Sequence, residues 1–410
     1  MATVHCRLLL VLSLALPLTV PALATELADE DDVGSPAMAP LPAEPTPASP
    51  DAAEPATPVW DGLALLQEHV PVGEFRTLYW SPEQSFQSID TPVPVLVAHG
   101  RQAGPRVCLT AAIHGDELNG IEMVRRLMYQ LEPGTMRGTV IGIPIVNLDG
   151  FRRGSRYLAD RRDLNRHFPG NPRASAADRI AHSLFDQVIR HCQLLVDLHT
   201  GSQQRTNLPQ IRGNLKDEAV FDFSRQFGGI TVLHGVGARG TLRRAANDTG
   251  IPAVTMEAGG PNQLDESAVD AGVKSLETLL QNLGMQQSSR FWSTPQPVFY
   301  QSDWVRADQG GILMSKVKPG DKVREGQILG TVVDPVTNTG SAILAPFNGR
   351  ILGMAVNQVV QTGFAAYHVG VETAAEKLQE EAIEKDLVEA PAASDCIAGS
   401  PAPVEPGHEC

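Results

Sequence analysis

The chain has 410 residues, of which 42% are hydrophobic, so it is long enough for two folded domains with buried cores. Its formal net charge is −14, but the acidic residues gather near the two ends. Residues 25–55 hold eight acidic residues and no basic one, and residues 375–410 hold nine acidic and two basic ones. The part between is nearly neutral, which argues against nucleic acid as a partner.

Residues 1–24 predict a secretory signal peptide. Arg7 supplies the positive start, Leu8–Val20 the apolar stretch, and Ala22–Ala24 the small residues of a cleavage site. A membrane anchor is the alternative, but the stretch is shorter than the roughly 20 residues that a span needs, and Pro17 interrupts it. No later stretch is apolar enough to span a bilayer. We therefore expect a secreted, periplasmic protein without a membrane span.

Four cysteines remain after the signal peptide. Cys108 and Cys192 lie in apolar surroundings, which favours buried free thiols in the core. Cys396 and Cys410 lie in the acidic tail, where an oxidising compartment would allow them to pair or to stay free.

Strands and helices alternate between about Arg106 and Gly284. Strands are predicted at 106–113, 139–146, 194–199 and 251–257. Helices are predicted at 118–131, from Ser175 towards Cys192, and at 267–283. The strands are continuous apolar runs, which is typical of a buried sheet. The predicted fold class is therefore α/β, with a mostly parallel or mixed sheet covered by helices on both faces.

Four further segments complete the predicted organisation. Residues 25–58 are rich in Ala, Pro, Asp and Glu and predict a disordered linker, and residues 59–288 hold the α/β domain. In residues 289–373 glycines recur and the strands are short, which indicates a small all-β domain. Residues 374–410 predict an acidic, disordered tail.

Two histidines and a glutamate follow predicted strand ends. His114 and Glu117 come three residues apart after one apolar run, and His199 ends another. Sites form at the carboxyl ends of parallel strands, so we expect these side chains to converge there. Two histidines and one glutamate with an open fourth position are typical of a catalytic zinc site. Either histidine alone would be interpreted as an ordinary core or surface residue. The combination of both with Glu117 predicts one zinc ion per chain.

An arginine-rich loop carries the second signal. It contains the string Asp163-Leu164-Asn165-Arg166-His167-Phe168-Pro169-Gly170. Six arginines lie in and around it: Arg152, Arg153, Arg156, Arg161, Arg162 and Arg166. Such a cluster is either a solvated loop or an anion-binding wall, since guanidinium groups grip carboxylates in a bidentate way. We expect two of the six to face the pocket.

Glu257 directly follows an apolar strand. A carboxylate in that place is unusual for a buried strand and suits a general base that takes a proton from water. A strand-end carboxylate that faces solvent is the alternative interpretation.

Together these strings resemble a known enzyme family. The order is H-x-x-E, an N-x-D-G-F segment, R-Y, D-L-N-R-x-F-P-G, D-L-H and E-x-G. It is similar to the succinylglutamate desuccinylase/aspartoacylase branch of the zinc carboxypeptidase superfamily, over roughly residues 95–285. The resemblance implies roles for the residues that follow. Zinc is held by His114, Glu117 and His199; Glu257 is the base; Arg156 stabilises the oxyanion; Asn165 and Arg166 bind a substrate carboxylate; Asp163 supports a histidine ligand, His114.

The all-β segment resembles the biotinyl/lipoyl barrel-sandwich fold. The strings from Val317 to Gly330 and from Ala345 to Gly349 fit its pattern. A carrier domain would show a lysine in the exposed hairpin, but residues 334–339 contain none. A structural or pocket-shaping role is therefore expected.

The sequence thus favours a secreted or periplasmic zinc-dependent hydrolase that cleaves an amide bond next to a free carboxylate. The substrate is expected to be a small N-acyl amino acid or a peptide. A non-catalytic zinc-binding or peptide-binding envelope protein on the same fold is the alternative. The acyl group, the leaving amine and the oligomeric state stay open.

Overall fold

The computed structural model describes residues 60–82, 91–202, 204–287, 297–356 and 358–373. The predicted signal peptide, linker and acidic tail lie outside these residues, as do Cys396 and Cys410. Within the described part of the chain, no helix is long and apolar enough to cross a membrane.

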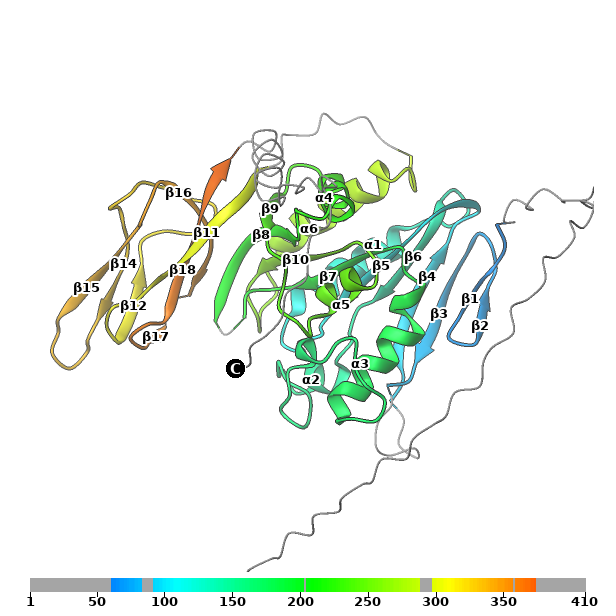
Figure 1. The fold of residues 1–410 in the computed structure, drawn as a ribbon, viewed down its shortest axis with the longest axis horizontal. Helices are drawn as coiled ribbons and strands as arrows, with labels where there is room; N and C mark the ends of the chain where they lie inside the picture. The colour runs from blue at the N-terminus through cyan, green and yellow to red at the C-terminus, as the bar shows by residue number, and fades with distance from the viewer. Residues whose placement is uncertain (1–59, 83–90, 203, 288–296, 357, 374–410) are drawn as a thin grey trace, which may run out of the picture. The chain divides into compact units, whose positions relative to one another are not determined.

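A twelve-stranded mixed sheet organises the molecule (Figure 1). Its spatial order is β13-β16-β18-β11-β9-β8-β10-β7-β5-β6-β4-β3. The strands are β3 Glu74–Trp80, β4 Val93–His99, β5 Gln102–Ala111, β6 Arg137–Ile143, β7 Leu194–His199, β8 Arg205–Gly213, β9 Thr231–His234, β10 Ala253–Gly259, β11 Val298–Arg306, β13 Lys322–Val323, β16 Gly349–Ala355 and β18 Ala365–Thr373. Strands β6, β5, β7 and β10 run parallel to one another, and so do β8, β9 and β11. The remaining pairs are antiparallel, so the expected mixed α/β sheet is present.

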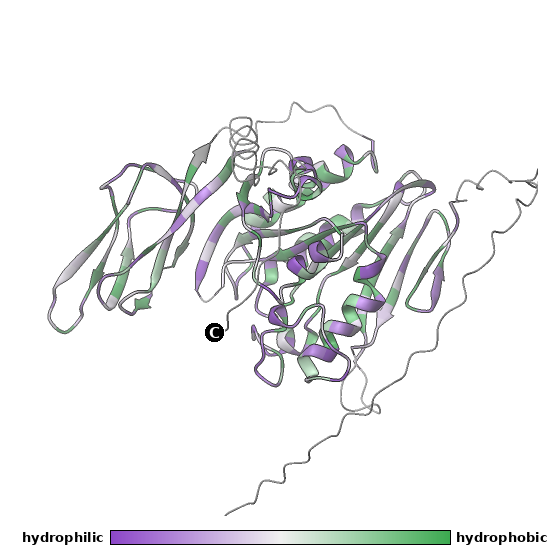
Figure 2. Cartoon of the chain, in the orientation of Figure 1, coloured by the Kyte–Doolittle hydropathy of each residue, from purple (hydrophilic) through white to green (hydrophobic). Residues whose placement is uncertain are grey.

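Six α-helices and three short 3-10 helices are seen among the described residues. They are α1 Leu118–Gln130, α2 Leu148–Arg152, η1 Leu164–Arg166, α3 Ala176–Gln187, η2 Ile189–His191, α4 Glu218–Ser224, η3 Arg225–Phe227, α5 Leu242–Asp248 and α6 Glu266–Asn282. Helix α3 begins as predicted at Ser175, whose hydroxyl accepts from the Asp178 backbone N–H in a capping box. Hydrophilic and hydrophobic residues alternate along the helices (Figure 2), as expected when one face of each helix is buried.

The helices cover the sheet from both sides. Side chains of α1, α4 and α6 pack with Val196 and Leu198 of β7 in one core cluster. Side chains of α3 and α5 pack with Leu195 of β7 in a second cluster. Successive residues of a strand point to opposite faces. Asp197 and His199 therefore share the face of Leu195, which is the α3 and α5 side.

The described part of residues 298–373 consists of strands and the turns and loops that connect them. A four-stranded antiparallel sheet has the order β15-β14-β12-β17. Its strands are β12 Gly311–Ser315, β14 Ile328–Val333, β15 Gly340–Leu344 and β17 Val359–Val360. Its buried side chains, such as Leu313 and Ile343, share a core with side chains of β16 and β18, such as Ile351. A hairpin of β1 Leu63–Leu65 and β2 Glu68–Val70 lies near the start of the described chain.

Cys108 and Cys192 form a disulfide, so the prediction of free core thiols is wrong. The two residues are 84 positions apart in sequence. Strand β5 pairs with β7, with Val107 opposite Leu194, and this pairing brings Cys108 close to Cys192, which lies two residues before the start of β7. Strand adjacency is a tertiary property, and nothing local in the sequence signals it. The disulfide cross-links the two strands that lead to His114 and His199.

Removing this cross-link should destabilise the fold. Replacing Cys108 and Cys192 together by alanine frees the intervening loop in the unfolded chain and should lower the free energy of unfolding by roughly 2–5 kcal/mol. Denaturant unfolding of the wild type and the double variant measures the difference. A reducing agent should lower the stability of the wild type and leave the double variant unchanged. Equal stability of the two oxidised proteins would contradict the prediction.

Candidate active site

The predicted site residues meet at one edge of the sheet. The neighbouring parallel strands β5, β7 and β10 all end there. His114 and Glu117 lie in the turn between β5 and α1, and His199 is the last residue of β7. Glu257 of β10 is paired in register with His199, which places the two side by side on adjacent strands. Strand adjacency thus brings together residues that are far apart in sequence.

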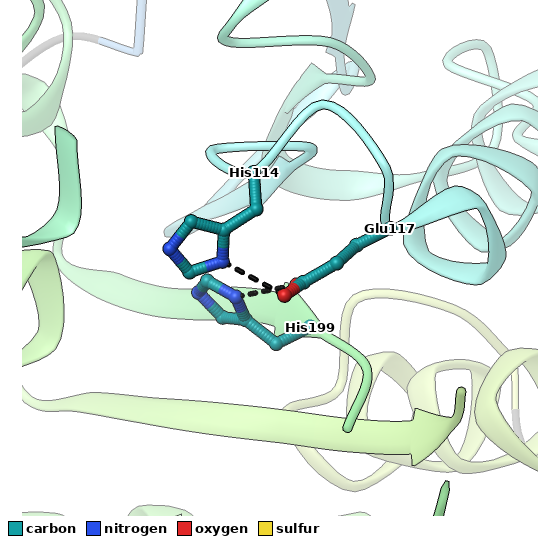
Figure 3. A group of neighbouring side chains, drawn as sticks. All are labelled: His114, Glu117 and His199. Atoms are coloured by element: carbon teal, nitrogen blue, oxygen red, sulfur yellow. Dashed lines mark hydrogen bonds and ion pairs between the residues drawn. The ribbon is translucent and has the colours of Figure 1, made fainter. Parts of the chain in front are cut away.

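His114, Glu117 and His199 form a buried cluster of metal-ligating side chains, with one donor atom from each within 4.8 Å of the others. Both imidazole rings turn their Nδ1 atoms towards the carboxylate of Glu117 (Figure 3). His114 Nδ1 is 2.8 Å from Oε1, and His199 Nδ1 is 2.8 Å from Oε2. The backbone N–H of Thr200 also donates to Oε2 at 3.2 Å.

A second carboxylate orients each histidine. The Nε2 atom of His114 lies 3.0 Å from Asp163, the contact that the family resemblance implies. The Nε2 atom of His199 lies 2.9 Å from Asp197, which sequence reasoning missed. Asp197 also accepts from the Thr110 hydroxyl at 2.8 Å and is fully buried. The Asp-x-His spacing could have identified Asp197 as a neighbour of His199, because residues two apart on a strand share a face.

The histidines and carboxylates of the cluster shift one another's pKa values. Burial alone would raise the pKa of Glu117, but His114 and His199 lower it well below its usual range. Burial would lower the pKa of His199, whereas Asp197 and Glu117 together raise it well above its ordinary value. For Asp163, burial is again outweighed, because the hydrogen bond and charge of His114 lower the pKa. The carboxylates of Glu117 and Asp163 are therefore held ionised beside the two rings.

This donor set fits a zinc ion. Two histidines and one glutamate are the ligands of known catalytic zinc sites. A carboxylate on the far nitrogen of each ring fixes its tautomer and leaves Nδ1 free to ligate, as is usual for zinc-bound histidine. Among the described residues, the carboxylates of Glu117, Asp163 and Asp197 pair with two guanidinium groups, that of Arg156 and, at 4.0 Å from Asp163, that of Arg166. A divalent cation would supply the missing positive charge without protonating either ring.

A cavity of about 270 Å³ opens onto this cluster. Seven of the eight predicted site residues line it. The eighth, Asp163, does not line the cavity but contacts Nε2 of His114. Two of the six clustered arginines, Arg156 and Arg166, reach the cavity, as expected. The other four are exposed.

The two loop arginines occupy different depths. Arg156 donates from Nη1 to Glu117 and from Nη2 to Asp163, both at 3.1 Å, so its guanidinium lies beside the metal-ligating group. The side chain of Arg166 is 51% exposed and lies at the entrance. Asn165 is fixed because its Oδ1 accepts from the backbone N–H of Leu242 at 2.8 Å. Its Nδ2 atom lies 3.4 Å from Nε2 of His199, at the wall of the cavity.

Glu257 is held from the side opposite to the histidines. Asn207 Nδ2 donates to its Oε2 at 2.7 Å, and Arg212 Nη1 lies 3.6 Å from its Oε1. Both partners come from β8, the antiparallel neighbour of β10. The carboxylate is thereby positioned one strand away from the metal-ligating cluster.

Sequence reasoning missed four large side chains of the cavity wall: Arg205, Arg212, Arg243 and Trp304. Trp304 belongs to β11, so the predicted pocket-shaping contribution of the β segment is present. Arg205 stacks on the rings of Trp304 and Phe364, with its Cζ 5.2 and 4.6 Å from their centroids. No motif marks these residues, because each acquires its place only when the strands pair.

Metal content tests the cluster directly. Protein purified with zinc should contain one zinc per chain, and His114→Ala or His199→Ala should lose it because each removes one of only three protein ligands. Elemental analysis of the purified variants gives the readout. His69→Ala, on exposed β2 outside the cavity, is the matched control and should keep its metal. Zinc retained in both ligand variants would rule the site out.

Comparison with known proteins finds similarity to one enzyme family. Residues 103–283 match the sequence model of the succinylglutamate desuccinylase/aspartoacylase catalytic domain. The chain is 26% identical over 263 residues to an N-alpha-acetyl-L-2,4-diaminobutyric acid deacetylase of Halomonas elongata, covering 61% of this chain and 76% of that protein. It is 31% identical over 133 residues to a succinylglutamate desuccinylase of Pseudomonas aeruginosa, covering 30% and 37% of the two chains.

Solved structures share the fold. A succinylglutamate desuccinylase from Silicibacter sp. superposes with a TM-score of 0.66 at 22% identity, covering 74% of this chain and 97% of that one. An ectoine utilization protein from Ruegeria pomeroyi gives 0.65 at 22% identity, with the same coverage. The sequence match, the fold and the site motifs agree. Residues 103–283 therefore resemble the succinylglutamate desuccinylase/aspartoacylase catalytic domain in sequence, and the solved structures share its fold.

Proposed function

We propose that the chain is a secreted, periplasmic, zinc-dependent hydrolase that cleaves an amide bond next to a free carboxylate. One observation carries the proposal: the cluster of His114, Glu117 and His199 lines the same cavity as Glu257. A metal-ligating triad and a carboxylate on the adjacent strand are the two parts that metal-assisted amide hydrolysis needs.

Each part has a chemical task. Zinc, when bound there, supplies a Lewis acid for polarising a carbonyl oxygen and for making water more acidic. Glu257 accepts the proton from the attacking water and returns it to the leaving nitrogen. Asn207 and Arg212 keep the Glu257 carboxylate in place for both transfers. Arg156 stabilises the negative charge that develops on the carbonyl oxygen.

The substrate is held by its carboxylate. Arg166 offers a planar guanidinium at the cavity entrance, and Asn165 offers amide donors beside it. This pair suits the free carboxylate of an N-acyl amino acid or of a peptide C-terminus. The relatives' names cover two leaving amino acids, diaminobutyric acid and glutamate, so the resemblance leaves the side chain open.

The disulfide supports the proposed location. Disulfides persist in oxidising compartments such as the periplasm and are rare in the cytosol. Cys108–Cys192 lies in the core, beneath the strands that carry the site. It agrees with the secretory signal peptide predicted from residues 1–24.

Glu257→Gln separates binding from chemistry. The amide keeps the shape of the side chain but cannot take up the proton, so turnover should fall by at least about 10²-fold while the zinc content stays unchanged. Initial rates on N-acyl amino acids and metal analysis of the same preparation provide the test. Glu68→Gln, exposed on β2, is the matched control and should turn over like the wild type. Near-normal turnover of the Glu257 variant would show that another group is the base.

Arg166→Lys tests the carboxylate anchor. Lysine keeps the charge but cannot form the bidentate contact, so the KM for carboxylate substrates should rise. Amidating the substrate carboxylate should impair the wild type strongly and the variant little, because both changes remove the same interaction. Kinetics of the four enzyme and substrate combinations measure the coupling. Equal cleavage of free-acid and amidated substrates by the wild type would indicate an endo-acting amidase.

A further inference from the structure

The disulfide and the metal-ligating cluster lie at opposite ends of one strand pair. Residues Val107–Ala111 of β5 pair in parallel register with β7. Cys108 lies near the start of this paired stretch and is joined to Cys192, which precedes β7. His114 follows the end of β5, and His199 is the last residue of β7. The two strands are therefore linked covalently where their pairing begins, and they carry candidate metal ligands where it ends.

The disulfide closes a loop that contains much of the site. The two cysteines are 84 positions apart, and the segment between them holds two of the three candidate ligands, His114 and Glu117. The same segment carries Arg156 and Arg166 of the cavity wall. The third ligand, His199, follows shortly after the loop, in β7. The bond therefore shortens the covalent path between His199 and the other two ligands, which limits how far they separate when the strands open.

The sulfur atoms are inaccessible while the strands stay paired. Cys108 is 2% exposed and Cys192 is 5% exposed, and both lie in the hydrophobic core. A reductant must reach a sulfur atom, so reduction requires local opening of this part of the fold. The same opening separates the strand ends, where Glu117 bridges His114 and His199 (Figure 3). A metal ion that binds only the closed arrangement stabilises it by mass action and therefore opposes reduction.

A buried hydrogen bond links the strand pairing to the orientation of His199. The hydroxyl of Thr110 in β5 donates to Oδ1 of Asp197 in β7 at 2.8 Å, and these two residues are opposite each other in the register. The other oxygen of Asp197 lies 2.9 Å from Nε2 of His199. The ring of His199 is therefore held in place only while β5 remains beside β7. Since the candidate metal site needs all three ligands at one point, it exists only in the closed strand pair.

We propose that the Cys108–Cys192 disulfide tightens metal binding by His114, Glu117 and His199, and that bound metal in turn protects the disulfide. The inference rests on the proposed function for the identity of the metal, zinc. Oxidation and metal binding both favour the closed strand pair, and thermodynamic linkage makes their effects mutual.

The coupling makes completion of the metal site depend on the redox compartment. Forming the S–S bond removes two protons and two electrons from the two thiols. A disulfide exchange partner in an oxidising compartment accepts them and leaves as a dithiol. A chain that is still reduced holds zinc more weakly, so the site gains its full affinity only after oxidation.

Zinc affinity measures the coupling from the side of the metal. The oxidised wild type and the double variant Cys108→Ala/Cys192→Ala are titrated with zinc against a chromophoric chelator, after circular dichroism has shown that both are folded. The wild type should bind zinc about 10-fold more tightly, a factor usual for coupled sites. Equal affinities of the two proteins would overturn the proposal.

Leu276→Ala is the matched control for a general loss of stability. It truncates a fully buried side chain of α6, which packs on the other face of the sheet, and leaves β5 linked to β7. This variant should therefore keep the wild-type zinc affinity. A loss as large as that of the double variant would mean that affinity follows overall stability rather than the disulfide, and would also overturn the proposal.

Reduction of the wild type measures the coupling from the side of the disulfide and needs no cysteine variant. The reductant is a phosphine, because thiols bind zinc. It takes up the oxygen of a water molecule to become a phosphine oxide while the disulfide becomes two thiols. Alkylation and mass spectrometry count the thiols over time, in urea at a concentration that leaves the metal-free protein folded. Saturating zinc should slow reduction by at least about 10-fold.

Two histidine variants assign this protection to the site. His199→Ala lacks one ligand and should be reduced at the same rate with and without zinc. His69→Ala, on exposed β2, should be protected by zinc like the wild type. A wild-type rate that zinc leaves unchanged, or equal protection of His199→Ala, would overturn the proposal.

Hydrolysis, measured separately on N-acyl amino acids and peptides, distinguishes this inference from the proposed function. Zinc-dependent hydrolysis together with a zinc affinity that is the same with and without the disulfide refutes the coupling and leaves the proposed function standing. Mutual protection of zinc and disulfide, together with no hydrolysis of any substrate, supports the coupling and refutes the proposed function.

Discussion

One buried carboxylate, that of Glu117, sets the arrangement of the whole site. It is 1% exposed, and a charge so deeply buried must be fully paired. Its partners come from three separate parts of the chain: His114 after β5, His199 and the following backbone at the end of β7, and Arg156 from the long loop. Satisfying this one group therefore fixes the relative positions of two strand ends and a loop that share no local sequence.

The alternation of side chains along the strands explains how an apolar sheet carries such a site. On the α3 and α5 face, β7 presents Leu195, Asp197 and His199 in turn, from the core towards the edge. On the same face β10 presents Ala253, Thr255 and Glu257. In each strand the apolar side chains near the start pack in the core, and the polar side chains of the site lie at the end. Their in-register pairing places groups of the same depth side by side.

The sequence predicts what depends on local pattern and misses what depends on pairing. Periodicity and the cap at Ser175 locate α1, α3, α6 and the central strands to within a few residues. Strand-end motifs identify His114, Glu117 and His199, which the structure brings together. The disulfide and the contributions of Arg212, Arg243 and Trp304 were missed, because they arise only when distant strands and helices come together. Asp197 belongs to the Asp-Leu-His motif. Residues two apart on a strand share a face, so the sequence was enough to place Asp197 on the same face as His199.

The order of the strands separates chemistry from selectivity. The residues of the candidate metal cluster follow or end β5 and β7, the proposed base lies on β10, and Arg212 and Arg243 of the cavity wall come from β8 and α5. Among the described residues, those of β8 and α5 hydrogen-bond to the proposed base and to Asn165 but to none of the three side chains of the candidate metal cluster. Substitution there would change which side chain the cavity accepts while the cluster around Glu117 keeps all of its partners. A shared fold and a shared His-Glu-His cluster are therefore compatible with different cavity walls among relatives, because the rest of the wall lies on other elements of the fold.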